Sequence, residues 1–186
     1  MKVAILAGGL GSRLAEETEV KPKPMVEIGG HPILWHIMKH YGHFGLRDFY
    51  VALGYKGDVI KRFFVDHSTL AGSLTVKTAT GQVASHSQGS DDWNVHLIET
   101  GAHTNTGGRV KRLESYLKDG TFLATYGDGV GDVDIGQLLK FHRAHGKLAT
   151  LTAVRPPARF GGLVFNGDLV APSTEKPQIG EGWING

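Results

Sequence analysis

The order of apolar and polar positions divides the chain into two alternating kinds of segment. Short apolar runs of strand length, bounded by glycine or polar residues, predict strands at 3–6, 48–53, 93–99, 122–126 and 149–154. Longer stretches with apolar residues at helical spacing predict helices at 32–44, 57–64, 104–117 and 135–145. Strands that alternate with helices in this way predict an α/β fold with a mainly parallel sheet flanked by helices.

The middle of the chain departs from this alternation. From His67 to Asp92 it is polar, rich in Ser, Thr and Gly, and without clear periodicity. Within it, residues 74–78 have a strand-like pattern, and we interpret much of the rest as loop or lid.

Composition and charge narrow the class of protein. With 186 residues, 40% hydrophobic and 20% charged, the chain is typical of one globular domain, expected over residues 1–186. The formal net charge of +2 and the scattered Lys and Arg argue against nucleic acid or an acidic membrane as partner. The absence of cysteine excludes disulfides and thiolate chemistry. The first apolar run is short and is followed by glycines and charges, unlike a signal peptide, so we expect a cytoplasmic protein.

The first apolar run leads directly into a candidate phosphate site. Residues 1–14 read MKVAILAGGLGSRL, and glycines in such a loop let a bulky anion lie against main-chain N–H groups. Arg13 supplies a fork of donors suited to phosphate oxygens, while Lys21 and Lys23 supply compact ammonium groups. A plain structural turn is the alternative for the glycine cluster alone, but the arginine and the two Lys-Pro steps favour phosphate binding.

Two common phosphate-binding motifs do not match this stretch. A P-loop ends in Gly-Lys-Ser/Thr, whereas Ser12 is followed by Arg13. A dinucleotide-binding fingerprint requires a glycine three residues after Gly11, where this chain has Leu14, and prolines interrupt the segment that follows. A nicotinamide-dependent dehydrogenase is therefore disfavoured.

Asp128 is the candidate metal ligand. It follows the strand predicted at 122–126, and open α/β sheets place ligand groups beyond the carboxyl ends of their strands. A carboxylate flanked by glycines can approach hydrated Mg²⁺, which takes one or two carboxylates plus substrate phosphates. The alternative is a turn aspartate bonded to its own backbone.

Asp132 and Asp134 form an Asp-x-Asp that could also bind metal. We interpret one of them instead as the cap of the helix at 135–145. The apolar side of that helix should face inward and comprises Leu138, Leu139 and Phe141.

Three histidines, His36, His40 and His43, fall at one- and two-turn spacing and could in principle hold zinc. The same positions fit the partly exposed side of an amphipathic helix, and the sequence shows no evident carboxylate partner. We favour the surface interpretation.

The N-terminal motifs resemble a known family. Gly-Gly-x-Gly-Ser-Arg-Leu at residues 8–14, followed by Lys-Pro-Met at residues 23–25, resembles the signature of the sugar-1-phosphate nucleotidylyltransferases. The fuller text KPKPMVEIGG from Lys21 and PILWHIM from Pro32 is similar to members that use CTP and glucose 1-phosphate. The resemblance implies a Rossmann-like fold of the nucleotide-diphospho-sugar transferase type, with Mg²⁺ as cofactor.

The resemblance also implies a reaction. The phosphate oxygen of the sugar 1-phosphate attacks the α-phosphorus of the nucleoside triphosphate and releases pyrophosphate. The second pKa of a phosphomonoester is about 6, so this nucleophile is largely anionic at neutral pH and requires no general base. The protein must bring two polyanions together and neutralise the charge that grows on their oxygens.

Matching positions imply site residues, which fall into three groups. The catalytic group comprises Arg13 on the β and γ phosphates, Lys23 between the α-phosphate and the sugar phosphate, and Asp128 on the metal, with Lys21 a weaker candidate. The nucleotide-binding group comprises Leu6, Ala7, Gly8, Gly9, Leu10, Gly11, Ser12, Arg13, Thr104, Gly108 and Arg109. The sugar-phosphate group comprises Lys23, Gly161, Glu175, Lys176 and Asn185.

Some expectations stay open at this point. Members of the family continue beyond the position of Gly186 and carry a second metal-binding aspartate there, so we expect the chain to lack the family's C-terminal part. The same reaction with UTP or dTTP, and a catalytically silent nucleotide-binding domain, are the alternatives to CTP-dependent transfer. The resemblance further implies a homo-oligomer that supplies nucleotide sugars for O antigen and lipopolysaccharide.

Overall fold

The computed structural model divides the chain into two compact units, residues 1–130 and 131–186. It describes residues 1–9, 21–70, 72–86, 91–155, 165–166, 169–170 and 184–185.

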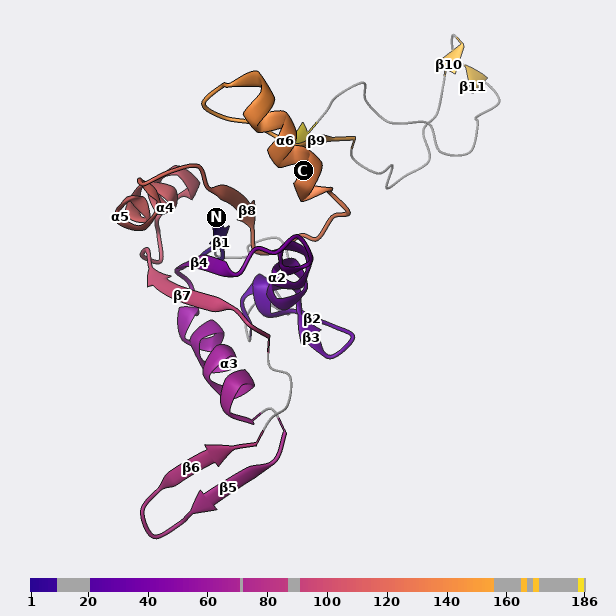
Figure 1. The fold of residues 1–186 in the computed structure, drawn as a ribbon. Coiled ribbons are helices and arrows are strands. Elements are labelled where there is room, and N and C mark those ends of the chain that lie inside the picture. The colour runs from indigo at the N-terminus through magenta and orange to yellow at the C-terminus, as the bar shows by residue number, and fades with distance from the viewer. Residues whose placement is uncertain are drawn as a thin grey trace. The chain divides into compact units, whose positions relative to one another are not determined.

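A four-stranded sheet forms the centre of the first unit (Figure 1). Its strands are β1 (Lys2–Leu6), β4 (Asp48–Leu53), β7 (Asn94–Glu99) and β8 (Leu123–Tyr126). All pairings are parallel, and the spatial order is β7-β4-β1-β8. The predicted α/β fold with a parallel sheet is confirmed. Because the chain proceeds outward from β1 to β4 and β7 and then returns to the other side of β1 for β8, the sheet has a topological switch point between β1 and β8.

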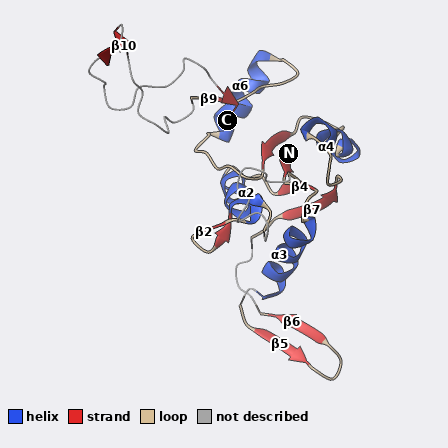
Figure 2. Cartoon of the chain, turned by 180° about the vertical axis from the view of Figure 1, so that it is seen from behind, coloured by secondary structure: helices blue, strands red, loops and turns tan. Residues whose placement is uncertain are grey.

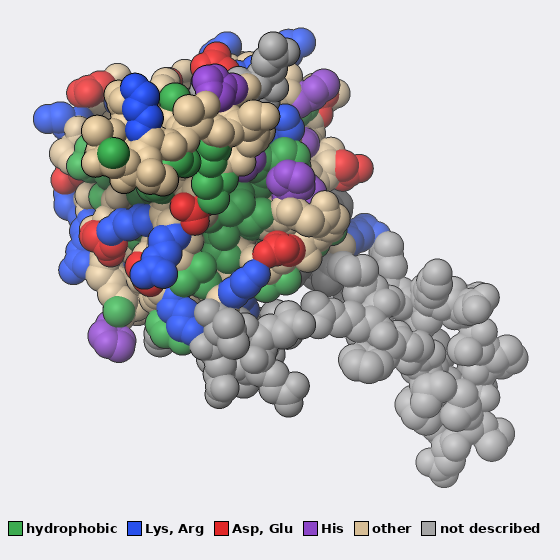
Figure 3. Space-filling model, turned by 90° about the horizontal axis from the view of Figure 1, so that it is seen from below, with side chains coloured by type: hydrophobic (Ala, Val, Ile, Leu, Met, Phe, Trp, Pro, Cys, Tyr) green, Lys and Arg blue, Asp and Glu red, His purple; other side chains and the backbone are tan. Residues whose placement is uncertain are grey.

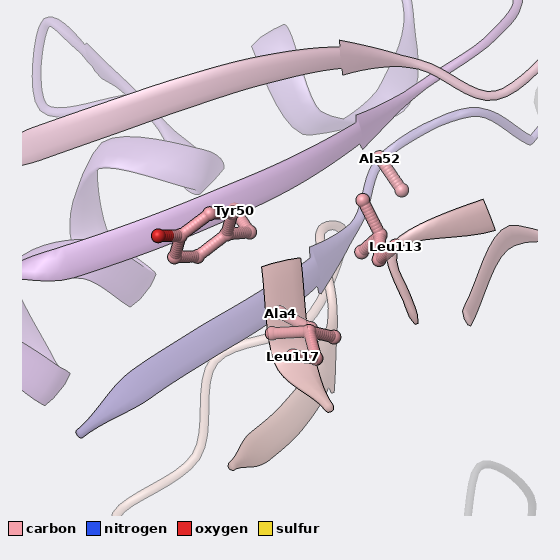
Figure 4. Packing of buried hydrophobic residues seen from close by; sticks show 5 residues of the cluster. All are labelled: Ala4, Tyr50, Ala52, Leu113 and Leu117. Carbon is pink, nitrogen blue, oxygen red and sulfur yellow. The ribbon is translucent and has the colours of Figure 1, made fainter. Parts of the chain in front are cut away.

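Helices cover both faces of this sheet (Figures 1 and 2). They are α2 (Ile33–His43), α3 (Gly57–Leu70), α4 (Thr106–Arg112) and α5 (Glu114–Leu117). On one face Phe49 of β4 meets Trp93, whose ring also contacts Trp35 of α2. The opposite face has a cluster drawn in Figure 4, with Leu113 and Leu117 packed on Ala4, Tyr50 and Ala52. Side chains of successive strand residues point to opposite faces, so a strand buried on both sides needs an unbroken apolar run.

Two helices differ from their predicted bounds. Helix α3 continues to Leu70, beyond the expected end at Phe64, and the ring of His67 stacks on Phe63 one turn earlier, with centroids 5.4 Å apart. The predicted helix through Leu117 consists of two successive helices that meet at Leu113, which is fully buried.

The polar middle of the chain contains a hairpin. Strand β5 (Leu74–Lys77) pairs antiparallel with β6 (Gln82–Ser85), and Gly81, with φ of 70°, lies in the turn between them. The strand predicted at 74–78 is confirmed, whereas interpreting residues 82–85 as loop was wrong. Because Leu74, Val76 and Val83 are all exposed, the alternation that identifies a half-buried strand is weak here.

The second unit contains α6 (Ile135–His145). The Asp134 carboxylate accepts a hydrogen bond from the Gln137 backbone N–H at 2.9 Å, which confirms the predicted cap, and Gly146 ends the helix with φ of 65°. Phe141 was expected to face inward but is 62% exposed, whereas Ile135 is buried. Among its described residues are also two small antiparallel pairs, β9 (Ala153–Val154) with β12 (Ile184–Asn185) and β10 (Phe165–Asn166) with β11 (Leu169–Val170).

The surface carries charges of both signs. On the face shown in Figure 3, Lys and Arg side chains are interspersed with Asp and Glu around hydrophobic ones. None of the described helices is long and apolar enough to span a membrane.

Candidate active site

A cavity of about 210 Å³ lies at the switch point of the sheet. It is lined by the loop after β1, the loop after β8, the segment before α4 together with residues of α4, and the 3₁₀ turn η1 (Lys23–Met25). Its lining comprises Leu6, Ala7, Gly8, Gly9, Lys23, Pro24, Thr104, Asn105, Thr106, Arg109, Tyr126 and Asp128. Parallel strands end at the same edge of a sheet, so segments far apart in sequence converge there.

Gly8 and Gly9 follow β1 but differ in their surroundings. Gly9 is exposed, and a Cβ added to it would meet nothing within 4 Å. Gly8 is buried, and its Cβ would lie 2.2 Å from Nη1 of Arg109. Close approach of a ligand is therefore open at Gly9, whereas at Gly8 the nearest group is a side chain of the protein.

The two Lys-Pro steps place their lysines differently. Pro22 and Pro24 are buried, and Lys23 between them is half-buried on the cavity wall. Lys21 is exposed and donates a hydrogen bond to Glu27 at 2.7 Å, which lowers the pKa of that carboxyl. The two rings restrict φ on both sides of Lys23, and their burial anchors this segment in the protein. Lys23 is thus the lysine that the structure brings to the cavity.

Asp128 lies on the same cavity as Lys23. Gly127 precedes it, and a Cβ there would be 3.2 Å from both the Leu6 carbonyl oxygen and Pro24 Cγ. The backbone N–H of Gly127 also donates to the Leu6 carbonyl at 3.0 Å. This close packing between the ends of β1 and β8 brings the carboxylate beside the glycine loop.

The donor set suits Mg²⁺ better than a metal held wholly by protein. Within the described residues no group of three or more His, Cys, Asp or Glu side chains could hold a metal ion. Asp128 is exposed at the cavity and would supply one carboxylate oxygen. Because Mg²⁺ typically combines one or two carboxylates with substrate phosphates, the residues present fit that ion.

Thr104 is held at the cavity by Arg112. Arg112 donates to Thr104 Oγ1 at 2.7 Å and also to the Thr100 carbonyl. Gly108 is absent from the lining, but a Cβ on it would be 2.8 Å from Thr104 Cγ2. Gly108 therefore leaves room for Thr104.

Arg109 reaches the cavity wall with its guanidinium bound to the protein. It is 4% exposed, and its hydrogen bonds go to Leu53, Thr100, Gly101, Ala102 and Gly8. Burial, with a smaller effect of neighbouring Arg112, lowers the pKa of Arg109.

Several predicted site residues lie outside the described residues, namely Leu10, Gly11, Ser12, Arg13, Gly161, Glu175 and Lys176. Asn185 belongs to β12 of the second unit. Their roles stay predictions.

The cavity also contains residues that sequence reasoning did not select, which are Pro24, Asn105, Thr106 and Tyr126. Tyr126 is the last residue of β8 and is 45% exposed. Its place directly before Gly127-Asp128 at a strand end is the signal that could have identified it.

The three spaced histidines of α2 show no zinc-like arrangement with other described residues. His36 Nε2 lies 2.8 Å from the Ile28 carbonyl oxygen, and His43 is exposed.

Comparison with known proteins indicates the same family as the N-terminal motifs. A family model described as nucleotidyl transferase matches residues 2–182. The chain belongs to the nucleotidyl transferase family. The whole chain is 52% identical to the glucose-1-phosphate cytidylyltransferase of Salmonella typhimurium, of which it spans 73%. It is 41% identical to a probable glucose-1-phosphate cytidylyltransferase of Bacillus subtilis, again over the whole chain and 72% of that protein.

A solved structure agrees with this nucleotidyl transferase fold. HddC from Yersinia pseudotuberculosis, in complex with GMP-PN, matches with a TM-score of 0.63 at 26% identity, over 99% of this chain and 73% of that protein. The sugar-1-phosphate nucleotidylyltransferase family indicated by the motifs is confirmed.

Proposed function

We propose that this nucleotidyl transferase transfers the cytidylyl group of CTP to glucose 1-phosphate, giving CDP-glucose and pyrophosphate. The observation that carries the proposal is the cavity at the switch point, which gathers the Gly8-Gly9 loop, Lys23 and Asp128 from three segments of the chain. The two cytidylyltransferase relatives, at 52% and 41% identity, support CTP and glucose 1-phosphate as the substrates.

In this proposal the protein acts by alignment and charge neutralisation. The nucleotide lies against the exposed backbone of Gly9, and Lys23 is placed between the α-phosphate and the incoming sugar phosphate. An ammonium there offsets the charge that develops on the oxygens around the α-phosphorus as the new P–O bond forms and the bond to pyrophosphate breaks. Arg13 follows the same loop and provides a bidentate donor for the β and γ phosphates.

Asp128 is the proposed ligand for Mg²⁺. Bound there together with triphosphate oxygens, Mg²⁺ would supply positive charge for the transferred and leaving phosphates. On the sugar side, Glu175 can accept hydrogen bonds from the sugar hydroxyls and Lys176 can pair with the sugar phosphate, with Gly161 and Asn185 as further contacts.

Pyrophosphate release tests the proposal. The purified chain is incubated with Mg²⁺ and glucose 1-phosphate, and CTP, UTP, dTTP, ATP and GTP are offered separately. We expect release that requires both CTP and the sugar phosphate. Release with UTP or dTTP instead would reassign the base, and saturable CTP binding without release would identify a silent nucleotide-binding domain.

We further propose that the protein works as a homo-oligomer in the cytoplasm and supplies CDP-glucose for O antigen and lipopolysaccharide. This rests on the family resemblance. Sedimentation of the purified chain tests the first point, with a monomer at micromolar concentration as the contradicting result.

A further inference from the structure

We propose that Tyr126 selects the sugar of the second substrate by packing its ring against one face of that sugar. The proposal rests on the proposed function, because it concerns how glucose 1-phosphate is recognised. Tyr126 lines the cavity at the end of β8, although the sequence motifs did not select it.

The order of the strands places Tyr126 at one end of the cavity. Among the described strands, β8 lies beside β1 at one end of the sheet, and β7 lies at the opposite end. The segment after β7 brings Thr104 to the cavity, whereas the end of β8 brings Tyr126 and Asp128. The glycine loop after β1 lies between these two groups, because β4 separates β1 from β7.

This arrangement follows the order of the groups in the product. In CDP-glucose the nucleoside and the sugar lie at opposite ends of a diphosphate. With the nucleoside at Thr104 and the diphosphate at Gly9 and Lys23, the sugar reaches the end of the cavity that β8 forms. The residue of β8 at that end is Tyr126.

The register of the sheet fixes the direction of the Tyr126 side chain. Tyr126 is paired with Leu6 of the parallel strand β1, so both side chains lie on the same face of the sheet. On that face Leu6 packs against the cluster that contains Leu113. A Cβ on Gly127 would instead lie 3.2 Å from Pro24 Cγ, on the other face. Leu6 and Tyr126 are therefore neighbouring apolar groups on the cavity wall.

The ring of Tyr126 is available to a ligand. Tyr126 is 45% exposed, and within the described residues its carbonyl accepts from Thr125 Oγ1 while its hydroxyl has no hydrogen-bond partner. It also supplies the aromatic ring of the described cavity lining. An exposed ring with a free hydroxyl on a cavity wall is typical of a ligand contact.

The chemistry of glucose 1-phosphate suits a flat aromatic ring. In the α configuration the phosphate is axial, and the opposite face of the sugar presents the axial hydrogens of C2 and C4. This face is apolar, so an aromatic ring can pack on it and exclude water. Mannose 1-phosphate places an axial hydroxyl on the same face at C2, and galactose 1-phosphate places one at C4. Packing against Tyr126 therefore favours glucose over both isomers.

Replacement of Tyr126 by Ala, Leu and Phe tests the proposal. We measure kcat and KM of pyrophosphate release for the three sugar phosphates at saturating CTP, and the Kd for CTP by titration. In Tyr126→Ala we expect the KM for glucose 1-phosphate to rise about tenfold or more, with the Kd for CTP within about twofold of wild type. Tyr126→Phe keeps the ring and should stay near wild type, and Tyr126→Leu should lie between.

The ratio of kcat/KM between glucose 1-phosphate and each isomer is a readout that a merely structural role would not change. An axial hydroxyl against an aromatic face loses its hydrogen bonds to water, so the wild-type protein should disfavour both isomers. In Tyr126→Ala both ratios should fall by about fivefold or more, because the flat surface is gone.

Tyr116→Ala is the matched control. Tyr116 is 39% exposed, belongs to α5 and does not line the cavity, and its ring is tilted toward Tyr50 with centroids 5.6 Å apart. Its loss should leave the KM for glucose 1-phosphate and both kcat/KM ratios unchanged. Equal changes in Tyr116→Ala and Tyr126→Ala would show a general loss of structure and overturn the proposal.

Saturation-transfer NMR provides a test that does not depend on turnover. Protein protons are irradiated in the presence of glucose 1-phosphate, and transfer to each sugar proton is measured. We expect stronger transfer to the protons on C2 and C4 than to those on C3 and C5, which lie on the other face. In Tyr126→Ala this difference should be lost, whereas Tyr126→Phe should keep it.

The contradicting outcomes are distinct. Weaker CTP binding in folded Tyr126→Ala with an unchanged KM for glucose 1-phosphate would place the ring at the nucleoside and overturn the proposal. Unchanged KM and unchanged ratios would overturn it as well. If wild-type protein releases no pyrophosphate, but transfer to the C2 and C4 protons is seen and is lost in Tyr126→Ala, the proposed function fails while the sugar contact stands.

Discussion

Lys23 and Lys21 share a sequence context but differ in position, which makes them a direct test of the site. Lys23 lines the cavity, and Lys21 forms an exposed ion pair with Glu27. In Lys23→Ala we expect kcat to fall by about 100-fold or more, since a charge aimed at the transition state is lost, with thermal stability nearly unchanged. In Lys21→Ala the fall should be much smaller. Equal losses in steady-state pyrophosphate release would contradict the assignment of Lys23.

A second prediction for a single residue concerns Asp91 and the pH dependence of stability. Asp91 accepts hydrogen bonds from Trp35 at 2.9 Å and Lys39 at 2.8 Å, both on α2, and lies 3.5 Å from His67 of α3. Burial alone would raise the pKa of Asp91, but the hydrogen bonds from Lys39 and Trp35 outweigh it and hold the pKa below its usual value. The folded protein therefore favours the ionised carboxylate.

The sign of the pH dependence follows from this lowered pKa. Stability from Asp91 is complete above its unfolded pKa of about 4 and is lost as the pH falls below that value. We expect Asp91→Asn to lower the free energy of unfolding by about 2 kcal/mol at pH 7, and by less at pH 3. Urea denaturation at both pH values measures the difference. An equal loss at the two pH values would show that charge plays no part, and exposed Asp119→Asn serves as control.

The site residues could be predicted only in part, for a physical reason visible in Arg109 and Gly8. Sequence spacing identifies groups able to bind phosphate, and the structure does bring Gly9, Lys23 and Asp128 to one cavity. Sequence spacing cannot show that Gly8 makes room for the buried guanidinium of Arg109, a residue 101 positions away. That contact depends on the strand order, which no local pattern encodes.

At the scale of elements, α6 offers a test of a predicted cap. Asp134 accepts from the Gln137 backbone N–H, and this hydrogen bond is the main reason why the pKa of Asp134 is lowered. In Asp134→Ala the first turn of α6 loses its acceptor, so we expect severalfold faster amide hydrogen exchange over residues 135–139. Asp132→Ala should leave that exchange unchanged. Equal acceleration in both variants would contradict the cap.

The elements themselves were predictable where burial imposes a pattern. The bounds of β4 are those predicted because both of its faces are apolar, as at Phe49 and Ala52. Strand β5 was predicted, but its partner β6 and the last turns of α3 were missed because their residues are largely exposed and carry little periodic signal. The switch point was also beyond sequence reasoning, since alternating strands and helices allow several strand orders.

At the scale of the whole molecule, ligand binding should appear as stability. A ligand that binds only the folded state at about 100 times its Kd adds about 2.7 kcal/mol to the free energy of unfolding. For a chain of this length that corresponds to a rise of about 5–10 °C in Tm. We expect such a rise with CTP and Mg²⁺, a smaller one with CTP and EDTA, and none with NADH. A rise with NADH would support the dehydrogenase alternative.

Asp128 decides how the stabilisation depends on metal, because it is the described carboxylate on the cavity wall. In Asp128→Asn the difference in Tm between CTP with Mg²⁺ and CTP with EDTA should largely vanish, while the rise with CTP and EDTA remains. Asp119→Asn, remote from the cavity lining, should keep the full metal-dependent difference. A full difference in Asp128→Asn would place the metal elsewhere. Loss of all CTP stabilisation would instead mean that this carboxylate organises the nucleotide site without metal.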